Sequence, residues 1–146
     1  RFNLPVGDFP LIGIITRFTT QKGIDLIINK IEEIVDLDVQ IIVLGAGDYN
    51  YEEFFKWAQN KYPNKIAIKI GYDFQLSHNI YAASDMFLMP SKFEPCGLGQ
   101  IISLNYGTLP IVRSTGGLAD TVIDISLDTE KGNGFSFLNY NADEMM

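Results

Sequence analysis

The sequence predicts an α/β fold in which helices cover both faces of a parallel β-sheet. Three observations predict it. Short apolar segments alternate about five times with longer segments of helical periodicity along the 146 residues. The short segments are apolar throughout rather than at every second position, as in strands that are buried on both faces. Glycine or proline marks several of the junctions between them.

The first strand and helix are the most regular part of the pattern. Residues 11–16 (LIGIIT) predict a buried strand, and a polar loop is expected at residues 17–22. From residue 24 to residue 35, apolar residues recur at spacings of three and four, which predicts an amphipathic helix. The acidic segment 36–38 ends this helix.

The middle of the chain continues the alternation with two strands and two helices. The apolar segments 39–44 and 65–70 are predicted strands. Residues 51–61 predict a helix that stops near Pro63, because a residue before proline avoids the helical conformation. Residues 74–84 predict a further helix.

Shorter elements fill the last third of the chain. They are a strand at 86–89 stopped by Pro90, a helix at 97–106, a strand at 109–112, a short helix from residue 118 and a strand at 135–138. A last helix barely begins at 144–146, with Asn141 or Asp143 as its cap. We therefore expect one domain over residues 1–146 that is truncated at both ends.

Charge, hydropathy and cysteine content exclude several classes of protein. The net charge of −7 argues against nucleic acid as a partner, although a few local cations can hold an anionic ligand in an acidic protein. No apolar run approaches the roughly 20 residues that span a bilayer, so we expect no membrane segment. The single cysteine, Cys96, cannot form an internal disulfide, which indicates a reducing compartment.

The segments that follow the strands are where a ligand is expected. In a parallel sheet these segments gather at the carboxyl ends of the strands, and ligands bind in the crevice there. The segments are 17–22, 45–48, 71–74, 91–97 and 113–117.

The first of these segments carries two cations, Arg17 and Lys22, just before a helix. A diphosphate leaving group needs positive charge where its own negative charge develops, so both are candidate catalytic residues. The alternative is that both are solvated surface cations.

The fourth segment, residues 91–100 (SKFEPCGLGQ), combines a carboxylate with backbone-bending residues. Pro95 and the glycines allow a tight turn and leave amide N–H groups free to bind an anion. Glu94 would enter the same crevice, where it can bind sugar hydroxyls or stabilise positive charge at an anomeric carbon. The alternative is an exposed acid at the start of a helix.

The remaining candidates are weaker on the sequence alone. Tyr72 can stack on a base or be an ordinary half-buried tyrosine. Residues 45–48 (GAGD) match only the beginning of a dinucleotide fingerprint and are better interpreted as a tight turn. A catalytic Cys96 thiol needs an activating base, and His78, the one histidine, lies about two elements away. One histidine and one cysteine cannot build a zinc site, so no metal centre is expected.

Three segments together resemble the bacterial glycogen synthases and plant starch synthases. Residues 16–26 (TRFTTQKGIDL) resemble the Arg/Lys segment of that family, and residues 90–98 (PSKFEPCGL) resemble its glutamate loop. Residues 106–122 are similar to the strand and glycine turn that follow. The resemblance implies the GT-B architecture, in which two Rossmann-like domains enclose a cleft. This chain would be the C-terminal, donor-binding domain, without the N-terminal domain.

The resemblance implies an activity and its partners. The family transfers glucose with retention from ADP-glucose to the non-reducing end of an α-1,4-glucan, without a cofactor or metal, in the bacterial cytoplasm or the plastid stroma. The implied partners are the nucleotide sugar, the α-glucan and the N-terminal domain of the same polypeptide, and the chain alone is expected to be inactive. The alternatives are a GT-B enzyme that uses UDP-glucose or another donor or acceptor, and a non-catalytic module that binds nucleotide or glucan.

The resemblance also implies roles for the side chains. Arg17 and Lys22 would contact the diphosphate and stabilise the leaving ADP. Glu94 would bind the donor glucose near its reacting centre. Tyr72 matches the position that stacks on adenine.

Backbone groups complete the implied donor site. The backbone at Cys96, Gly97 and Leu98 would bind glucose hydroxyls and phosphate. Gly99 replaces a threonine of some synthases, which leaves only a backbone contact there. Ile102 stands where many related transferases carry a second glutamate, so the first glutamate alone takes a role.

Overall fold

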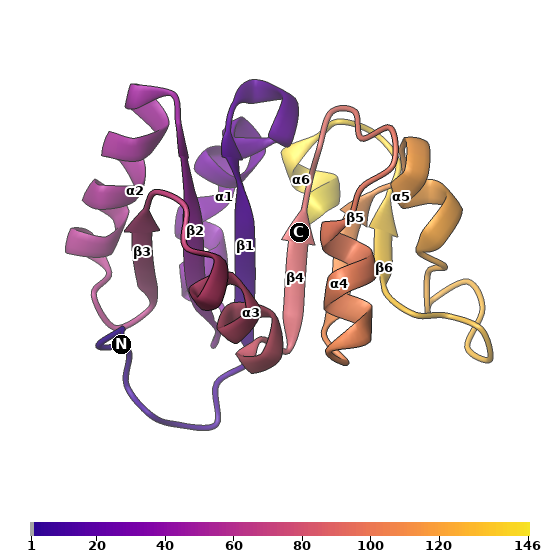
Figure 1. The fold of residues 1–146 in the computed structure, drawn as a ribbon, viewed down its shortest axis with the longest axis horizontal. Coiled ribbons are helices and arrows are strands. Elements are labelled where there is room, and N and C mark those ends of the chain that lie inside the picture. The colour runs from indigo at the N-terminus through magenta and orange to yellow at the C-terminus, as the bar shows by residue number, and fades with distance from the viewer. Residues whose placement is uncertain (1) are drawn as a thin grey trace.

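The sheet is six-stranded and fully parallel, with the strand order β3-β2-β1-β4-β5-β6 (Figure 1). The computed structural model describes residues 2–146. The strands are β1 Leu11–Phe18, β2 Gln40–Gly47, β3 Ile66–Ile70, β4 Met86–Met89, β5 Leu109–Arg113 and β6 Phe135–Phe137. The helices are α1 Ile24–Asp36, α2 Tyr49–Lys61, α3 Phe74–Ala83, α4 Gly99–Asn105, α5 Gly116–Thr121 and α6 Ala142–Met145, and a 3-10 turn, η1 Thr20–Lys22, precedes α1. The predicted fold class is confirmed.

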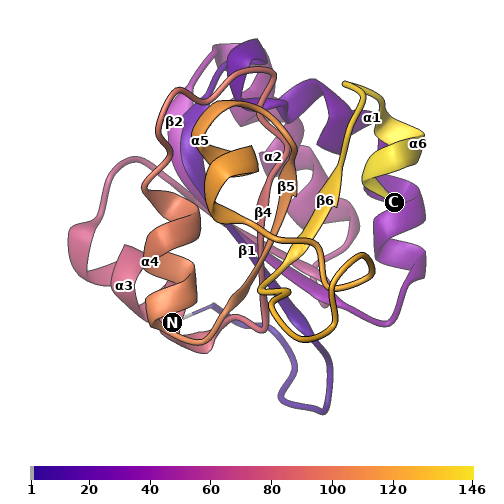
Figure 2. The same ribbon diagram turned by 90° about the vertical axis from the view of Figure 1, so that its right-hand side faces the viewer.

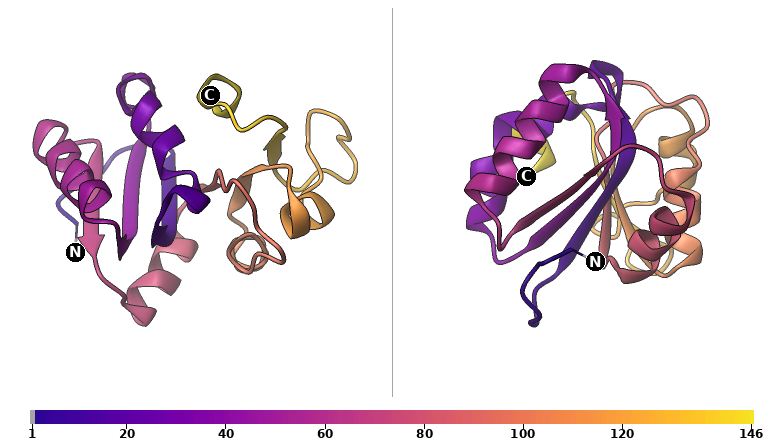
Figure 3. Two further views of the ribbon diagram at one scale, coloured as in Figure 1. Left: turned by 90° about the horizontal axis from the view of Figure 1, so that it is seen from above. Right: turned by 60° about the vertical axis from the view of Figure 1, so that its left-hand side comes forward.

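Helices enclose the sheet in two layers (Figure 2, Figure 3). Helices α1, α2 and α6 lie on one face, and α3, α4 and α5 lie on the other. Side chains of β1 alternate between the two layers, because successive residues of a strand point to opposite faces. Ile12 and Ile14 join the core under α1 and α2, whereas Leu11 and Ile15 pack with the residues under α3. Burial on both faces explains why the strand segments are apolar at nearly every position.

The first two strands extend beyond their predicted ends. Strand β1 pairs with β2 as far as Phe18, so the loops expected at 17–22 and 45–48 begin later than predicted. Phe18 explains the extension, because it is fully buried and its ring lies 5.1 Å from that of Phe55 in α2. Arg17 is therefore a strand residue rather than a loop residue.

Local backbone chemistry explains two further shifted boundaries. Helix α2 begins before its predicted start because the Asp48 side chain accepts a hydrogen bond from the Asn50 amide and caps it. Helix α4 begins after its predicted start because Gly97 has a φ of 67°, in the left-handed region. Asn141, one of the two expected caps of the last helix, accepts from the amides of Asp143 and Glu144.

Asp124 fixes the edge strand β6 to the segment after α5. The residue is only 9% exposed. One carboxylate oxygen accepts from the amide and hydroxyl of Ser126, at 2.8 and 2.6 Å, and the other accepts from the amide and hydroxyl of Ser136, at 2.6 and 3.1 Å. The hydroxyl of Ser126 contributes most to lowering the pKa of Asp124, and the other hydrogen bonds lower it further.

We expect Asp124→Asn to lower the free energy of unfolding by about 1 to 3 kcal/mol at neutral pH, because hydrogen bonds to a buried charge are lost. A lowered folded-state pKa stabilises the protein above the unfolded-state pKa, and this contribution is lost as pH falls through the folded-state value. The difference between wild type and variant should therefore shrink on acidification in urea titrations. Asp38→Asn is the control, because the Asp38 side chain is 85% exposed. An Asp124 effect that did not change with pH would contradict the assignment.

Candidate functional site

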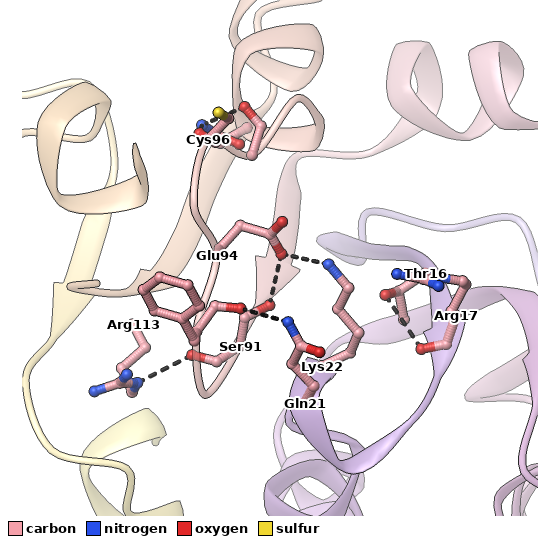
Figure 4. A network of polar contacts seen from close by, with 11 residues as sticks. Thr16, Arg17, Gln21, Lys22, Ser91, Glu94, Cys96 and Arg113 are labelled. Carbon is pink, nitrogen blue, oxygen red and sulfur yellow. Dashed lines mark hydrogen bonds and ion pairs between the residues drawn. The ribbon is translucent and has the colours of Figure 1, made fainter. Parts of the chain in front are cut away.

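An ion pair joins the two charged segments that the sequence singled out (Figure 4). The Lys22 ammonium nitrogen lies 2.5 Å from Oε2 of Glu94, although the residues are 72 positions apart. The hydroxyl of Ser91 donates to the same carboxylate oxygen at 3.2 Å. The Lys22 and Glu94 side chains are 16% and 13% exposed, so their charges are only partly screened by solvent. The predicted convergence of the two segments at the carboxyl edge of the sheet is thus observed for Lys22 and Glu94.

Backbone contacts hold the Lys22 segment against the glutamate loop, residues 91–97. Lys22 ends η1, and the next residue, Gly23, has a φ of 73°. A β-carbon at Gly23 would lie 2.1 Å from the carbonyl oxygen of Pro90, so only glycine allows this approach. The Lys92 amide donates to the Gln21 carbonyl at 2.9 Å. These contacts set the position from which Lys22 reaches Glu94.

The first turn of α5 supports the other side of the glutamate loop. The Gly117 amide donates to the carbonyls of Glu94 and Pro95, at 3.0 and 3.1 Å. A β-carbon at Gly117 would lie 2.0 Å from the Cys96 carbonyl oxygen. The glycine turn that follows β5 therefore packs directly beneath the backbone of the loop.

Gln100 fixes the second half of the loop from inside the protein. Its side chain is fully buried, and its amide nitrogen lies 3.2 Å from the Cys96 carbonyl and 2.9 Å from the Gly97 carbonyl. Within residues 2–146, the backbone amides of Cys96, Gly97 and Leu98 donate to no other protein group. Loop carbonyls are thus bound internally, while the amides of these three consecutive residues have no protein acceptor in the described part of the chain.

A hollow of about 290 Å³ lies at the carboxyl ends of β1 and β2, on the α3 side of the sheet. Arg17 and Tyr72 line it, together with small and apolar residues from the ends of β1 and β2. The lining residues are Ile15, Thr16, Arg17, Leu44, Gly45, Ala46, Gly71, Tyr72 and Ser77. The hollow suits a flat, mostly apolar group with a charge near its rim.

The predicted site residues therefore fall into two groups. Lys22 and Glu94 are in contact, whereas Arg17 is exposed, lies apart from them (Figure 4) and lines the hollow. Tyr72 is 87% exposed, so the alternative of a half-buried tyrosine is wrong. Cys96 is exposed, and His78 instead places Nδ1 2.8 Å from the Tyr106 hydroxyl.

Two residues near the ion pair were missed by sequence reasoning. Arg113 ends β5, and its guanidinium donates to the carbonyls of Ser91, Lys92 and Leu138. The sequence did offer a signal for Arg113, because it is a cation at the carboxyl end of a predicted strand. Tyr140, whose hydroxyl reaches Asp25 and Thr20, had no such signal because its contacts arise only in the folded chain.

Residues 2–146 contain neither a metal-binding cluster nor a membrane-spanning helix. No group of three or more His, Cys, Asp or Glu side chains there is arranged to hold a metal ion. None of the helices in that part of the chain has the length and apolar character to cross a bilayer.

Comparison with known proteins gives a consistent family. The whole chain, residues 1–146, matches the family model described as glycosyl transferases group 1. The glycogen synthase of Bacillus cereus (strain B4264) is 55% identical over 146 residues, which are 99% of this chain and 31% of that protein. The glycogen synthase of Clostridium botulinum (strain Alaska E43 / Type E3) is 55% identical over 139 residues, which are 95% of this chain and 29% of that protein.

A solved structure agrees with these relatives. The catalytic domain of starch synthase IV from Arabidopsis thaliana, bound to ADP and acarbose, superposes with a TM-score of 0.91 and 39% identity over 99% of this chain and 31% of that chain. The present chain spans less than a third of each of these three proteins. The resemblance to glycogen and starch synthases is confirmed, and the chain belongs to the group 1 glycosyl transferases.

Proposed function

We propose that this chain is the donor-binding C-terminal domain of a glycogen or starch synthase. The complete enzyme would transfer glucose with retention from ADP-glucose to the non-reducing end of an α-1,4-glucan. The observation that carries the proposal is the contact between Lys22 and Glu94, on the same loop as three amides that have no protein acceptor within residues 2–146. This arrangement provides a cation for a leaving diphosphate and a carboxylate for a sugar within one crevice.

The ion pair gives Lys22 and Glu94 their proposed roles. In the free protein each neutralises the other, and both keep a partly exposed face. A bound donor would offer phosphate oxygens to the Lys22 ammonium and sugar hydroxyls to the Glu94 carboxylate. Ser91 keeps one carboxylate oxygen in place during this exchange. The ammonium would then stabilise the charge that develops on the departing ADP.

Backbone groups and the hollow would hold the rest of the donor. The amides of Cys96, Gly97 and Leu98 would bind phosphate and glucose hydroxyls, with Gly99 contributing backbone alone. Adenine would lie in the hollow against Tyr72, and Arg17 would meet the diphosphate from its rim. The proposed transfer uses no cofactor and no metal, as the resemblance to the synthases implies.

The proposal includes a second domain. Acceptor contacts would come from an N-terminal domain of the same polypeptide, so this chain alone should not elongate a glucan, because catalysis needs donor and acceptor held together. This chain covers only 29% and 31% of the length of the two glycogen synthases, which supports this arrangement. We place the enzyme in the cytoplasm of a bacterium or in the plastid stroma.

Titration calorimetry of the intact enzyme with ADP, ADP-glucose and UDP-glucose tests the donor site. We expect ADP-glucose to bind more tightly than UDP-glucose, and Tyr72→Ala to weaken ADP binding by about 1 to 3 kcal/mol, the value of one base stacked on an aromatic ring. Phe74→Ala is the matched control, because Phe74 is also exposed but lies outside the hollow.

Other outcomes of the titration separate the alternatives. Tighter binding of UDP-glucose would assign the enzyme to another donor. If the intact protein binds glucan or nucleotide but does not transfer glucose, it is a non-catalytic binding module. Equal effects of the two aromatic substitutions would remove Tyr72 from the base site.

A further inference from the structure

Tyr140 lies between β6 and α6, yet its hydroxyl contacts the segment that carries Lys22. The hydroxyl lies 2.5 Å from Oδ1 of Asp25 and 3.1 Å from the carbonyl oxygen of Thr20, and it donates toward both. Thr20 begins η1 and Asp25 lies in the first turn of α1, so the two contacts bracket Lys22. The 3-10 turn itself has no side-chain cap. Tyr140 therefore supplies a further side-chain anchor to this turn, in addition to the contact of the Thr20 hydroxyl with the Tyr51 hydroxyl at 3.0 Å.

The ring of Tyr140 faces the other segment of the site. The Lys92 ammonium lies 5.6 Å from the ring centroid, and the centre of the Arg113 guanidinium lies 5.8 Å from it. Both distances are within the range of cation–π attraction. One side chain therefore contacts the Lys22 segment through its hydroxyl and the cations beside the glutamate loop through its ring.

Arg113 holds the start of the glutamate loop. Its Nε donates to the Ser91 carbonyl at 3.0 Å, and a terminal nitrogen donates to the Lys92 carbonyl. Its other terminal nitrogen donates to the Leu138 carbonyl at 3.1 Å, near Tyr140 in the chain. Ser91 and Lys92 precede Glu94 by three and two positions, so the guanidinium fixes the backbone that leads to the carboxylate.

The Tyr140 hydroxyl keeps its proton under ordinary conditions. Partial burial, followed by the neighbouring Asp25 carboxylate, raises the pKa of Tyr140 above its usual value. The hydroxyl therefore stays protonated and can donate its single proton to the Asp25 carboxylate or to the Thr20 carbonyl.

We propose that Tyr140 and Arg113 are positioning residues that together hold Lys22 and Glu94 at the separation needed to bind one donor molecule. This inference rests on the function proposed for Lys22 and Glu94. Neither positioning residue touches the reacting groups, and each acts through the segment it holds. A displaced ammonium would meet the leaving diphosphate poorly in the transition state, so the effect should appear mainly in kcat.

Tyr140→Phe in the intact enzyme tests the anchor, because it keeps the ring and removes the hydroxyl. We expect kcat for transfer from ADP-glucose to fall about tenfold, the scale of one hydrogen bond to a charged group, with KM changed much less. Arg113→Lys keeps the charge but loses the forked contacts, and it should lower kcat similarly. Tyr62→Phe is the matched control, because it removes another tyrosine hydroxyl from a glutamate, Glu32, at 3.2 Å and outside the site. That variant should keep the wild-type kcat.

A double variant shows whether Tyr140 acts through Lys22. If it does, adding Tyr140→Phe to Lys22→Ala should lower kcat little further, because the anchored group is already gone. A fully additive loss, or a lower melting temperature of Tyr140→Phe with wild-type kcat, would overturn the inference. Failure of the positioning role can be told apart from failure of the proposed function. In the second case the wild-type enzyme itself would show no transfer from ADP-glucose. An active wild type, an impaired Lys22→Ala and an unaltered Tyr140→Phe would refute the positioning role alone.

Discussion

Lys22→Ala should lower kcat for glucose transfer by the intact enzyme by about 10²- to 10³-fold, the usual cost of removing one preorganised donor to a developing charge. Lys22 is the cation in direct contact with Glu94, at 2.5 Å, and only 16% of its side chain is exposed. Its charge therefore acts on a bound diphosphate with little screening by solvent. The chain should still fold, because Ser91 continues to donate to the carboxylate that loses its partner. Steady-state kinetics with ADP-glucose measures the loss.

A surface lysine provides the control for this prediction. Lys56 also pairs with a glutamate, Glu53, at 2.7 Å, but this pair lies on the exposed side of α2. Exposed pairs of this kind contribute little, so Lys56→Ala should keep wild-type kcat. Wild-type kcat in Lys22→Ala would instead mean that the ion pair is structural, and the leaving group would need another cation. Arg17, which lines the hollow, would then be the residue to test.

Periodicity predicted the fold well because apolar side chains must meet the sheet whatever the rest of the chain does. The strand at 86–89 has its predicted bounds, and the amphipathic segment from residue 24 forms α1, in which every apolar residue except Ile28 is buried. The extension of β1 to Phe18 was not predictable in this way. It depends on Phe55, which lies 37 positions later and meets Phe18 only after α2 has packed on the sheet.

The candidate site was predictable where the chemistry is local and not where it is assembled. A glutamate beside proline, cysteine and glycine is visible as a loop, and Lys22 stands just before a helix. Their contact follows from the parallel order of β1 and β4, which brings the ends of these strands to one edge. Tyr140 had no comparable signal, because a tyrosine after the last strand is unremarkable until the fold sets its ring against Arg113.

Gly23→Ala should have the largest effect on stability, because this residue joins the Lys22 segment to α1. A β-carbon would lie 2.1 Å from the Pro90 carbonyl oxygen, and a backbone atom cannot turn aside as a side chain can. The φ of 73° adds the strain of an L-residue in the left-handed region. We expect a loss of about 2 to 5 kcal/mol in the free energy of unfolding, from roughly 1 to 2 for the strain and 1 to 3 for the overlap. This is a large share of the stability of a typical domain.

Gly107→Ala separates the two causes of this loss. Gly107 has a similar φ of 79°, but a β-carbon there would meet no atom within 4 Å, so this variant should lose only about 1 to 2 kcal/mol for the strain. Urea unfolding of both variants measures the difference. The slope of the free energy of unfolding against urea concentration (the m-value) should be unchanged. Because the glutamate loop follows Pro90 directly, any shift that relieves the overlap in Gly23→Ala also moves Lys22 relative to Glu94. The variant should therefore lose donor affinity even at temperatures where it is folded, whereas Gly107→Ala should not. Equal losses of stability in the two variants would show that the backbone around Pro90 yields freely, and Gly23 would then not set the spacing of the ion pair.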